Sequence, residues 1–460
     1  MTSPHNFDPS ILRAYDIRGI YEETLTNADA YNVGRSFAKY MQNKGWKTAS
    51  VGRDGRVSSP ALEESLVRGL IDSGVNVTRI GVCPTPMLYF AQHHLDTDTG
   101  LMISGSHNPP HHNGIKICLR TGPFYGEDIQ QLGKIAAVGD YISGQAGEDK
   151  FVDVMPDYLN MLLSDLNNNY DDASKGFKIA WDTGNGSAGE VVKKLTEKLP
   201  GEHHLLFNEI DGTFPNHHPD PCVPENLDDL IAFVKANDLD FGFAFDGDGD
   251  RLGLVDNKGR ILCGDTMLTL LAEEVLTNQP GAKILADVKC SQVMFDRINA
   301  MGGEPVMCRT GHSLIKAKMQ ETGSPLAGEM SGHIFFADRL NGVDDAMYAA
   351  IRVIGGLTRK SESLTQWYDN YPQLITTPEI QYDCPDDKKF AFIANIKQHL
   401  LDQGANFNDI DGVRVTTENG WWLVRASNTQ AVLTARMEAN DEAGMANIKA
   451  EVDRAMSFLG

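Results

Sequence analysis

The sequence has few cysteines, and their spacing does not indicate a zinc site or a disulfide framework. The seven cysteines are scattered along the chain, and none belongs to a Cys-x-x-Cys motif. A structural zinc site needs closely spaced ligands, and small secreted domains carry an even number of cysteines. We therefore expect reduced thiols and a cytoplasmic protein.

Long apolar runs are also absent. No stretch approaches the roughly 18 apolar residues that a membrane-spanning helix requires. The segment from Met1 to Pro9 is polar and lacks the apolar centre of a signal peptide. The sequence therefore predicts neither a membrane span nor a secretory leader.

Basic residues are scarce relative to acidic ones. Lys and Arg total 41 against 63 Asp and Glu, which gives a formal net charge of −22. Nucleic acids and anionic membranes bind clustered positive charge, so this balance argues against both as partners. A phosphate-bearing ligand would need a local group of cations in an otherwise acidic protein.

The chain is instead rich in strands that alternate with helices. At about 150 residues per domain, its 460 residues suggest about three domains. One unit of strand, helix, strand, helix, strand and strand occurs three times, and its first strands begin near residues 49, 178 and 284. The second of these units is expected to have its second strand at 205–210.

The third strand of each unit is the one that precedes a polar, glycine-rich loop. These strands are expected at 101–103, 241–245 and 326–327. Strands separated by helices pair in parallel with right-handed crossovers, and ligands then collect beyond their carboxyl ends. Three unlike loops in one topological position therefore predict three domains that face a single cleft.

The C-terminal part follows a different pattern. Asn419-Gly420 is a strong two-residue turn signal between strands at 413–415 and 421–424. A further strand passes through Leu433, and apolar residues from Met445 to Met456 mark a final helix. The fold class is therefore α/β, with three similar mixed α/β sheet domains and a smaller α+β C-terminal domain around a central cleft. The expected domains are 1–153, 154–257, 258–370 and 371–460.

The first polar loop contains a candidate nucleophile. Pro109 and Pro110 cannot continue a strand, so they stop the ladder and stiffen the loop that follows Ile103. Ser106 then lies at the carboxyl end of a strand on a rigid turn, where a nucleophilic hydroxyl can be presented. An ordinary serine turn between two strands is the alternative, and the motif SGSH by itself favours it.

The second loop, DGDGDR at 246–251, contains a candidate metal site. Asp246, Asp248 and Asp250 alternate with glycines that let the loop fold around an ion, and carboxylates suit Mg²⁺ or Ca²⁺. The loop is not an EF-hand, because Arg251 and Asn257 occupy the sixth and twelfth positions. The alternative is an acidic, solvated turn. We expect the carboxylates to matter for the chemistry of the site and not for folding.

Two further loops contain candidate ligand-binding groups. Arg425 with Ser427, Asn428 and Thr429 could clamp a phosphate through its guanidinium, hydroxyls and loop N–H groups, although a polar turn after a hairpin is as consistent with the pattern. In the motif GEMSGH, Glu329, Ser331 and His333 could bind sugar hydroxyls, or form a tight turn that satisfies its own hydrogen bonds.

Other charged residues carry weaker signals. Isolated arginines are mostly solvated, and this interpretation applies to Arg13, Arg18, Arg53 and Arg56 when each is taken alone. The histidine pairs at 111–112, 203–204 and 217–218 have no metal-ligand companions nearby in the sequence, so we expect them at the surface.

Taken together, the loops resemble those of a known family. SGSHNPP at 104–110, DGDGDR at 246–251, GEMSGH at 328–333 and RASNTQ at 425–430 are similar to the four active-site loops of the α-D-phosphohexomutases, in order over nearly the whole chain. AYDIRG at 14–19, GRDGR at 52–56 and TGHS at 310–313 are similar to further family motifs. The bacterial phosphomannomutase/phosphoglucomutase branch is the most similar, because phosphoglucosamine mutases typically have Gln where this chain has Met330.

The resemblance implies an enzyme that interconverts hexose 1-phosphate and hexose 6-phosphate, of mannose and/or glucose, through a phosphoserine and a 1,6-bisphosphate. It implies Mg²⁺ as cofactor and the hexose 1,6-bisphosphate as primer. Ser106 would carry the phosphoryl group and, with Asp246, Asp248 and Asp250, hold the metal. Arg251 would neutralise charge during transfer, and Arg18, Lys116 and His333 would handle protons. The implied substrate-binding residues are Tyr15, His107, Asn108, Lys289, His312, Glu329, Ser331, Arg425, Ser427, Asn428 and Thr429.

Three alternatives remain at this point. A phosphoglucosamine mutase would share most of the motifs. A metal-dependent sugar-phosphate phosphatase would share Ser106 and the acidic loop, but would need neither GEMSGH nor a second phosphate clamp. A non-catalytic sugar-phosphate sensor would need no nucleophile. In each case we expect small sugar phosphates as partners, and a chain that acts as a monomer or a weak dimer.

Overall fold

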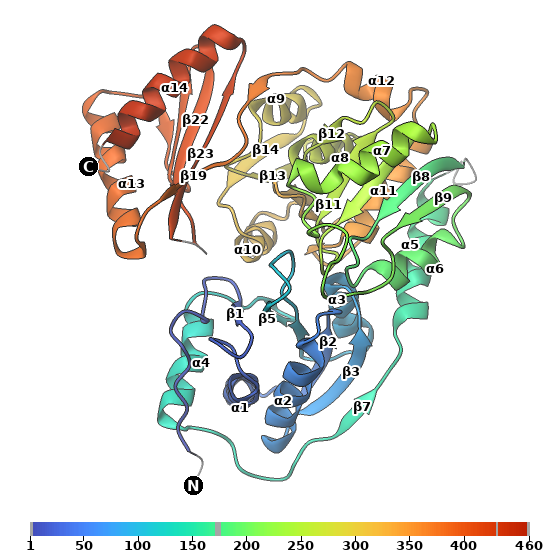
Figure 1. Cartoon of the computed structure of the whole chain (residues 1–460), viewed down its shortest axis with the longest axis vertical. Coiled ribbons are helices and arrows are strands. Elements are labelled where there is room, and N and C mark those ends of the chain that lie inside the picture. The colour runs from blue at the N-terminus through green and yellow to red at the C-terminus, as the bar shows by residue number, and fades with distance from the viewer. Residues whose placement is uncertain (1–2, 171–175, 429–430, 458–460) are drawn as a thin grey trace.

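The computed structural model describes residues 3–170, 176–428 and 431–457 (Figure 1). Four β-sheets follow one another along the chain. The first sheet and its helices lie at one end of the molecule, and the C-terminal sheet lies beside the third. Among the described residues, no helix is long and apolar enough to cross a membrane.

The first sheet has seven strands in the order β1-β5-β4-β2-β3-β7, with β6 paired to β5. Its elements are β1 (Ile17–Ile20), α1 (Asn27–Lys44), β2 (Thr48–Arg53), α2 (Ser59–Asp72), β3 (Asn76–Val82), α3 (Thr85–His94), β4 (Thr99–Ile103), β5 (His112–Leu119), β6 (Gly122–Pro123), α4 (Glu127–Val138) and β7 (Asp149–Phe151).

The second sheet has five strands in the order β12-β11-β10-β8-β9. Its elements are α5 (Met155–Asn169), β8 (Phe177–Asp182), α6 (Gly189–Thr196), β9 (Gly201–Leu206), the 3-10 helix Pro224–Leu227, α7 (Asp228–Ala236), β10 (Phe241–Phe245), β11 (Leu252–Asp256) and β12 (Ile261–Leu262).

The third sheet has five strands in the order β14-β13-β15-β16-β17. Its elements are α8 (Gly264–Asn278), β13 (Lys283–Asp287), α9 (Gln292–Ala300), β14 (Glu304–Cys308), α10 (His312–Thr322), β15 (Leu326–Gly328), β16 (Ile334–Phe336), β17 (Val343–Asp344), α11 (Ala346–Thr358) and α12 (Leu364–Asp369).

The fourth sheet is antiparallel and has six strands, β18-β23-β22-β21-β20 with β19 paired to β23. Its elements are β18 (Ile375–Thr376), β19 (Ile380–Asp383), α13 (Asp386–Asp402), β20 (Phe407–Asn408), β21 (Val413–Thr417), β22 (Gly420–Ala426), β23 (Val432–Ala439) and α14 (Glu442–Met456). The expected hairpin and the expected C-terminal helix are confirmed, but the two-residue turn is Glu418-Asn419, because Gly420 already pairs with Thr417.

The first three sheets share one topology, as the repeated unit predicts. In each, the third strand of the unit (β4, β10 or β15) pairs in parallel with the first and antiparallel with the fourth. The antiparallel pairing follows from the short connection, since a parallel return would need a crossover of a dozen or more residues. The three polar loops are these short connections, so each is held at both ends by one pair of strands.

One strand differs from its expected position. The expected strand at 205–210 is β9, which spans Gly201–Leu206 and pairs with β8 from Phe177 to Asp182. Phe207 has a φ of 50°, a left-handed conformation that ends the extended strand. The apolar residues at 205–210 therefore straddle the strand end.

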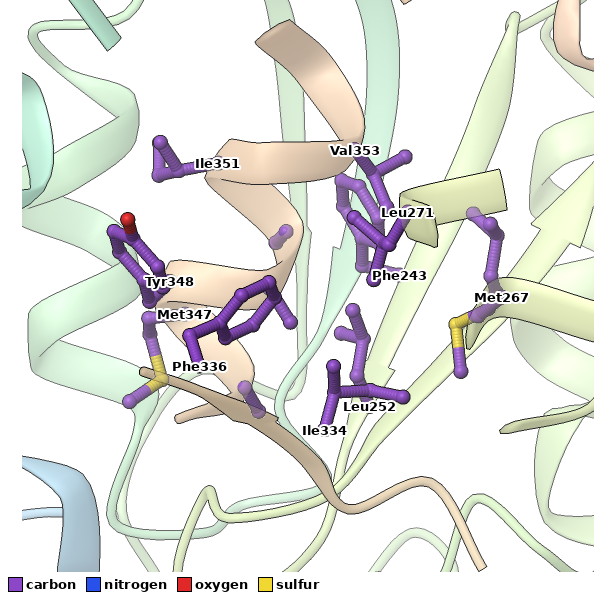
Figure 2. Packing of buried hydrophobic residues seen from close by; sticks show 14 of the residues in the cluster. Phe243, Leu252, Met267, Leu271, Ile334, Phe336, Met347, Tyr348, Ile351 and Val353 are labelled. Atoms are coloured by element: carbon purple, nitrogen blue, oxygen red, sulfur yellow. The ribbon is translucent and has the colours of Figure 1, made fainter. Parts of the chain in front are cut away.

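The first three units share a continuous apolar core. Phe243 and Leu252 of the second sheet lie among Ile334 and Phe336 of the third and side chains of α11 (Figure 2). Met87, Leu88 and Met102 of the first unit belong to the same core. The C-terminal unit has a core of its own, and a small separate cluster of Val288, Trp421 and Leu423 joins it to the third. The loops on the first three sheets are therefore held in one packed body.

Candidate active site

The Ser106 turn has a left-handed backbone. Ser106 has a φ of 50°, its side chain is almost fully buried, and it follows β4 by three residues. A non-glycine residue in this region is strained, so neighbouring contacts must hold it. Ser104 supplies one, because its Oγ accepts from Ser106 N at 2.8 Å and donates to Asp248 Oδ2 at 2.8 Å.

Arg56 organises the same turn from beneath, and the expectation that it is a solvated arginine is wrong. Its guanidinium is buried and donates to four backbone carbonyls of this turn and the residues after it, those of Ser106, Asn108, Pro109 and His112, at 2.6–3.0 Å. Asp54 accepts from Arg56 Nε at 3.1 Å and from Gly105 N at 3.0 Å. An arginine is needed because its planar fork can donate in several directions from one fixed position.

Arg56→Lys is therefore expected to loosen the turn while preserving charge. Lysine has one donor nitrogen, and each lost hydrogen bond from a charged donor costs about 1.5–3 kcal/mol. We expect a lower melting temperature and a kcat reduced by roughly 10–100-fold, since misplacement of a reacting group by about 1 Å can cost that much. Steady-state kinetics and thermal unfolding measure both effects.

Arg53→Lys is the matched control for that variant. Arg53 lies three residues away, is partly exposed and pairs with Glu63 through Nε at 3.0 Å. Equal losses in the two variants would contradict a specific role for Arg56 in the Ser106 turn.

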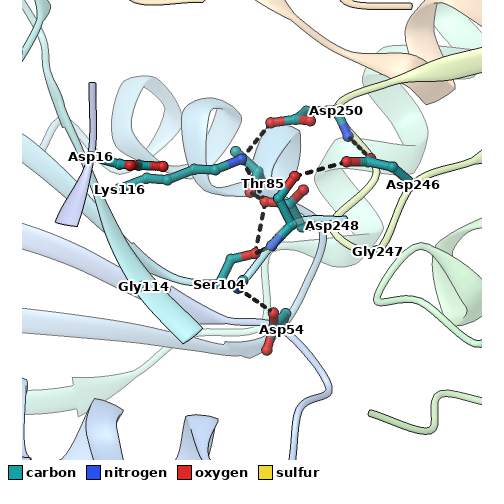
Figure 3. A network of polar contacts seen from close by, with 12 residues as sticks. Asp16, Asp54, Thr85, Ser104, Gly114, Lys116, Asp246, Gly247, Asp248 and Asp250 are labelled. Atoms are coloured by element: carbon teal, nitrogen blue, oxygen red, sulfur yellow. Dashed lines mark hydrogen bonds and ion pairs between the residues drawn. The ribbon is translucent and has the colours of Figure 1, made fainter. Parts of the chain in front are cut away.

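The three aspartates of the second loop converge on the Ser106 turn, as Figure 3 shows for their carboxylates and Lys116. Asp246, Asp248 and Asp250 are buried, and one oxygen from each lies within 4.8 Å of the others. Ser106 Oγ donates to Asp246 Oδ2 at 3.0 Å, which joins residues 140 positions apart. The alternative of a solvated acidic turn does not agree with this burial.

Lys116 neutralises part of the acidic cluster. Its Nζ donates to Asp248 Oδ2 at 2.7 Å and to Asp250 Oδ2 at 2.6 Å. Burial opposes its charge, but the three carboxylates outweigh burial and raise the pKa of Lys116. Burial and the charges of Asp250 and Asp248 raise the pKa of Asp246 well above its usual range. The cluster is thus short of positive charge.

The donor set fits a divalent cation. Asp248 Oδ1 and Asp250 Oδ1 are buried and accept no hydrogen bond from the described part of the chain. Such oxygens are costly to bury unless an ion or another donor reaches them, and hard carboxylate oxygens suit Mg²⁺. Asp246, Asp248, Asp250 and the adjacent Ser106 hydroxyl could hold a metal ion here.

Arg251 and His333 face the acidic cluster from two different sheets. Arg251 Nε donates to His333 Nε2 at 3.0 Å. The other ring nitrogen, His333 Nδ1, lies 2.9 Å from Asp344 Oδ2 and 3.6 Å from Asp250 Oδ1. The second and third polar loops therefore meet at this pair, as one shared cleft requires.

Arg18 and the residues after Ser106 complete the side of the first sheet. Arg18, on β1, donates through Nη1 to Asn108 Oδ1 at 3.0 Å and through Nη2 to Asp16 Oδ2 at 2.6 Å. His107 Nδ1 lies 3.1 Å from Ser106 Oγ. Burial and the nearby Arg251 and Arg18 guanidinium groups lower the pKa of His107 well below its usual range, so its imidazole is neutral.

The carboxylate of Glu329 accepts hydrogen bonds from within the GEMSGH loop and from the loop before α10. Glu329 Oε2 accepts from Ser331 Oγ at 2.9 Å, and Oε1 accepts from Gly311 N at 2.6 Å. His312 begins α10, and its ring lies 5.9 Å from that of His333. The side chains of His312, Glu329, Ser331 and His333 lie together at the carboxyl edge of the third sheet. Glu329 and Ser331 are hydrogen-bonded to each other.

The C-terminal unit reaches the cleft through its RASNTQ loop. Arg425 Nε donates to Asp411 Oδ2 at 3.0 Å, and the same oxygen accepts from Thr310 N at 3.1 Å. Asn428 Nδ2 donates to Tyr15 Oη at 2.6 Å, and Tyr15 Oη donates to the carbonyl of Thr310 at 3.2 Å. The first, third and fourth units therefore meet at Tyr15.

The remaining predicted substrate-binding residues are Lys289, Ser427 and Thr429. Lys289 is buried, with Nζ 3.3 Å from Glu379 Oε2 of the C-terminal unit. Ser427 is buried, and its N–H donates to the carbonyl of Val432 at 3.0 Å. Thr429 lies outside the described residues.

Several residues of the site were not predicted from the sequence. Thr85 donates to Asp248 Oδ2 at 2.6 Å, Asp344 faces His333, and Asp411 holds Arg425. None of these has a local sequence signal, because each acts only through a distant partner. The histidine pairs are also less exposed than expected, since His217 is partly buried with Nε2 3.0 Å from Asp182 Oδ2.

Comparison with known proteins agrees with this geometry. The chain matches the family models for phosphoglucomutase/phosphomannomutase alpha/beta/alpha domain I over residues 9–140, domain II over 156–259, domain III over 263–374 and the C-terminal domain over 379–455.

Individual relatives match over nearly their full length. A phosphomannomutase/phosphoglucomutase from Pseudomonas aeruginosa is 45% identical over 440 residues, which cover 96% of this chain and 94% of the relative. A phosphoglucomutase from Neisseria meningitidis is 42% identical over 96% of each chain. The crystal structure of a family protein from Burkholderia thailandensis superposes with a TM-score of 0.91 at 40% identity, covering 98% of this chain and 97% of that one. The resemblance inferred from the loops is therefore confirmed, and the chain belongs to the phosphoglucomutase/phosphomannomutase family of phosphohexomutases.

Proposed function

We propose that this protein interconverts the 1-phosphate and the 6-phosphate of mannose and/or glucose through a phosphoserine at Ser106 and a hexose 1,6-bisphosphate. The observation that carries the proposal is the contact of Ser106 Oγ with Asp246 Oδ2, at 3.0 Å, inside a buried cluster of three carboxylates. When a candidate nucleophile and a metal-binding loop from two different domains meet in one buried site, the arrangement indicates that they act in the same reaction.

The metal ion would be Mg²⁺, held by Asp246, Asp248, Asp250 and an oxygen of phosphorylated Ser106. When bound, it would neutralise charge on the phosphoryl group during in-line transfer. Arg251 lies next to the cluster and would contact the same phosphoryl oxygens. Phosphoserine carries a charge of about −2, which requires these cations in an acidic protein.

Proton handling follows from the states of two side chains. The sugar hydroxyl that attacks phosphorus must lose a proton, and the Ser106 oxygen that leaves must gain one. The carboxylates raise the pKa of Lys116 and keep it as an ammonium ion, so it holds a proton of the kind that the Ser106 oxygen must gain. His333 presents a lone pair at Nε2, which suits an acceptor. Arg18, bonded to Asn108, is a further candidate that would stabilise charge beside Ser106.

The remaining residues would bind the sugar and its distal phosphate. We assign the sugar to Glu329 and Ser331, with His312 and Lys289 beside them, and the distal phosphate to Arg425, Ser427, Asn428 and Thr429. Tyr15, His107 and Asn108 would shape the phosphoserine side of the cleft. A sugar hydroxyl that reaches Glu329 would replace the hydrogen bond from Ser331. The hexose 1,6-bisphosphate would also act as the primer that phosphorylates Ser106.

The test of the proposal is turnover of three substrates by the Mg²⁺-loaded enzyme with bisphosphate primer. Measuring kcat/KM for mannose, glucose and glucosamine 1-phosphates distinguishes the proposed activity from that of a phosphoglucosamine mutase. Release of inorganic phosphate at the same rate as loss of sugar 1-phosphate would instead indicate a phosphatase. No turnover of any of the three would contradict the proposal.

Arg425→Ala tests whether one clamp holds the phosphate in both substrate orientations. Losing a charge-assisted contact should cost about 1.5–3 kcal/mol, which is one to two decades in kcat/KM. We expect glucose 1-phosphate and glucose 6-phosphate to be impaired by similar factors, since each places its phosphate at the same clamp. Phosphorylation of Ser106 by the bisphosphate should weaken as well.

Arg454→Ala is the control, because Arg454 is an exposed arginine on α14 of the same C-terminal unit. It changes the net charge equally and should leave both reactions unchanged. An Arg425→Ala enzyme that handles one monophosphate normally and fails with the other would contradict a two-way clamp.

A further inference from the structure

The two ring nitrogens of His333 have different partners, and these partners determine its tautomer. Arg251 Nε, which always carries a hydrogen, donates to His333 Nε2 at 3.0 Å. Nε2 must therefore present its lone pair. In the neutral imidazole the hydrogen then resides on Nδ1, which lies 2.9 Å from Asp344 Oδ2.

Asp344 is a fully buried carboxylate with both oxygens in ion-pair contact. It ends β17, and its Oδ1 lies 2.6 Å from Lys316 Nζ on α10. Burial opposes its charge, but Lys316 and His333 outweigh burial and hold the pKa of the Asp344 carboxyl well below its usual range. Asp344 is therefore an anion whose Oδ1 faces Lys316 and whose Oδ2 faces His333.

The same atoms could suggest a second metal site, but the hydrogen positions argue against it. Asp250, His333 and Asp344 each present a ligand atom within 4.8 Å of the others. A metal ion at Nδ1 would require the hydrogen to move to Nε2, where it would oppose the N–H of Arg251. Lys316 also already supplies positive charge to Asp344. The 2.9 Å approach of Nδ1 to Asp344 Oδ2 is an electrostatic contact that orients the ring, although it lacks the alignment of a hydrogen bond.

We propose that Asp344 is a positioning residue that holds His333 in the tautomer with hydrogen on Nδ1 and the lone pair on Nε2. This inference rests on the proposed function, in which His333 accepts the proton of the attacking sugar hydroxyl. In that step the sugar oxygen forms a bond to phosphorus, the bond between phosphorus and Ser106 Oγ breaks, and the sugar proton moves to Nε2. The Ser106 oxygen takes a proton from Lys116, and the reverse half-reaction restores both groups.

The inference also assigns Arg251 a second role. Its Nε donates to the lone pair of His333, so Nε2 becomes available only when the guanidinium turns toward the phosphoryl oxygens. Asp344 then stabilises the imidazolium that forms, as a buried carboxylate does for histidine in other acid–base sites. Lys316 keeps the other oxygen of Asp344 directed away from His333.

Asp344→Asn is the test, because it preserves size and removes the anion. The amide oxygen should face Lys316, which turns the NH₂ group toward Nδ1 and favours hydrogen on Nε2 instead. We expect kcat for glucose 1-phosphate to fall about 100-fold while KM changes less than about threefold, because substrate contacts remain. Loss of the carboxylate in the serine protease triad has a larger effect, about 10⁴-fold, but there no arginine also orients the ring.

Asp345→Asn is the matched control. Asp345 is the next residue and is similarly buried, but it accepts from Tyr158 Oη at 2.9 and 2.8 Å and caps α11 through Tyr348 N at 2.9 Å. The same substitution there perturbs folding without changing the partner of His333, and it removes less charge because burial raises the pKa of Asp345 to about 7. Equal kcat values in the two variants would overturn the proposal.

The tautomer is read directly from ¹⁵N spectra of histidine-labelled, Mg²⁺-loaded enzyme, with the His333 signals identified by their loss in His333→Gln. Wild-type His333 should carry hydrogen on Nδ1, and the Asp344→Asn variant should carry it on Nε2. A wild-type spectrum with hydrogen on Nε2 would overturn the inference even if the variant fails to fold. Because this readout needs no turnover, a wild-type enzyme that shows the Nδ1 hydrogen but converts no sugar phosphate would refute the proposed function alone.

Discussion

Ser106→Ala is expected to remove the covalent phosphate and nearly all turnover together. Ser106 Oγ is the hydroxyl that lies on the left-handed turn and donates to Asp246, and alanine leaves no atom to carry the phosphoryl group. Losing a nucleophile normally costs several orders of magnitude, so we expect kcat to fall by at least about 10³-fold. The turn itself should persist, because Arg56 holds its backbone carbonyls.

Two measurements check this expectation. Intact-mass analysis should show one phosphate on part of the wild-type sample and none on the variant, and peptide analysis should place it at Ser106. Ser65→Ala on α2 is the control, because the Ser65 hydroxyl only donates to the carbonyl of Ala61 within its own helix. An Ser106→Ala enzyme that retains more than about a tenth of wild-type kcat would exclude Ser106 as the carrier.

Asp248→Asn is expected to have the second-largest effect, and it should act on stability as well as on turnover. The substitution removes one of three clustered charges, so metal affinity should drop and kcat should fall by about 10²-fold or more. Asp248 Oδ2 also accepts hydrogen bonds from Thr85, Ser104 and Lys116, at 2.6, 2.8 and 2.7 Å. The melting temperature without metal should therefore also decrease, which revises the expectation that this loop matters only for transfer.

The metal dependence of unfolding separates the two effects. A ligand that binds only the folded state stabilises it by about 2.7 kcal/mol at one hundred times its dissociation constant, so wild-type melting should rise with added Mg²⁺. Asp248→Asn should lose most of this rise. Asp229→Asn, an exposed change of equal charge on α7, should keep it. Full activity after chelation of divalent ions would mean that the aspartates serve another purpose.

The functional loops could be predicted from the sequence because their signals are local. Proline interrupts the hydrogen bonding of a strand in any context, so Pro109 and Pro110 end the one before them. Alternating Asp and Gly residues from Asp246 form a tight carboxylate-rich turn. The repeated order of strands and helices then predicts that these loops share one edge. The features of each loop depend on residues within about ten positions of one another, whereas the repeat is read from the order of whole elements.

Two helices, α11 and α8, escaped prediction for a physical reason. α11 has every residue buried except Gly356, because it packs between α5 and β11 of the second unit and α8 of the third. α8 is similarly buried over most of its length. A helix enclosed on all sides has no polar face, so it lacks the 3.6-residue periodicity by which an amphipathic helix is identified.

The local chemistry of each loop is thus a property of the sequence: a hydroxyl on a stiff turn, carboxylates beside glycines, and an arginine after a hairpin. Their convergence is a property of the tertiary structure. Ser106 meets Asp246 across 140 positions, and Asn428 meets Tyr15 across 413. Burial of Arg56 beneath the Ser106 turn and of Asp344 behind His333 likewise depends on distant partners. The charge of a side chain follows from its identity, but its partner and solvent exposure arise only when distant surfaces pack together and exclude water.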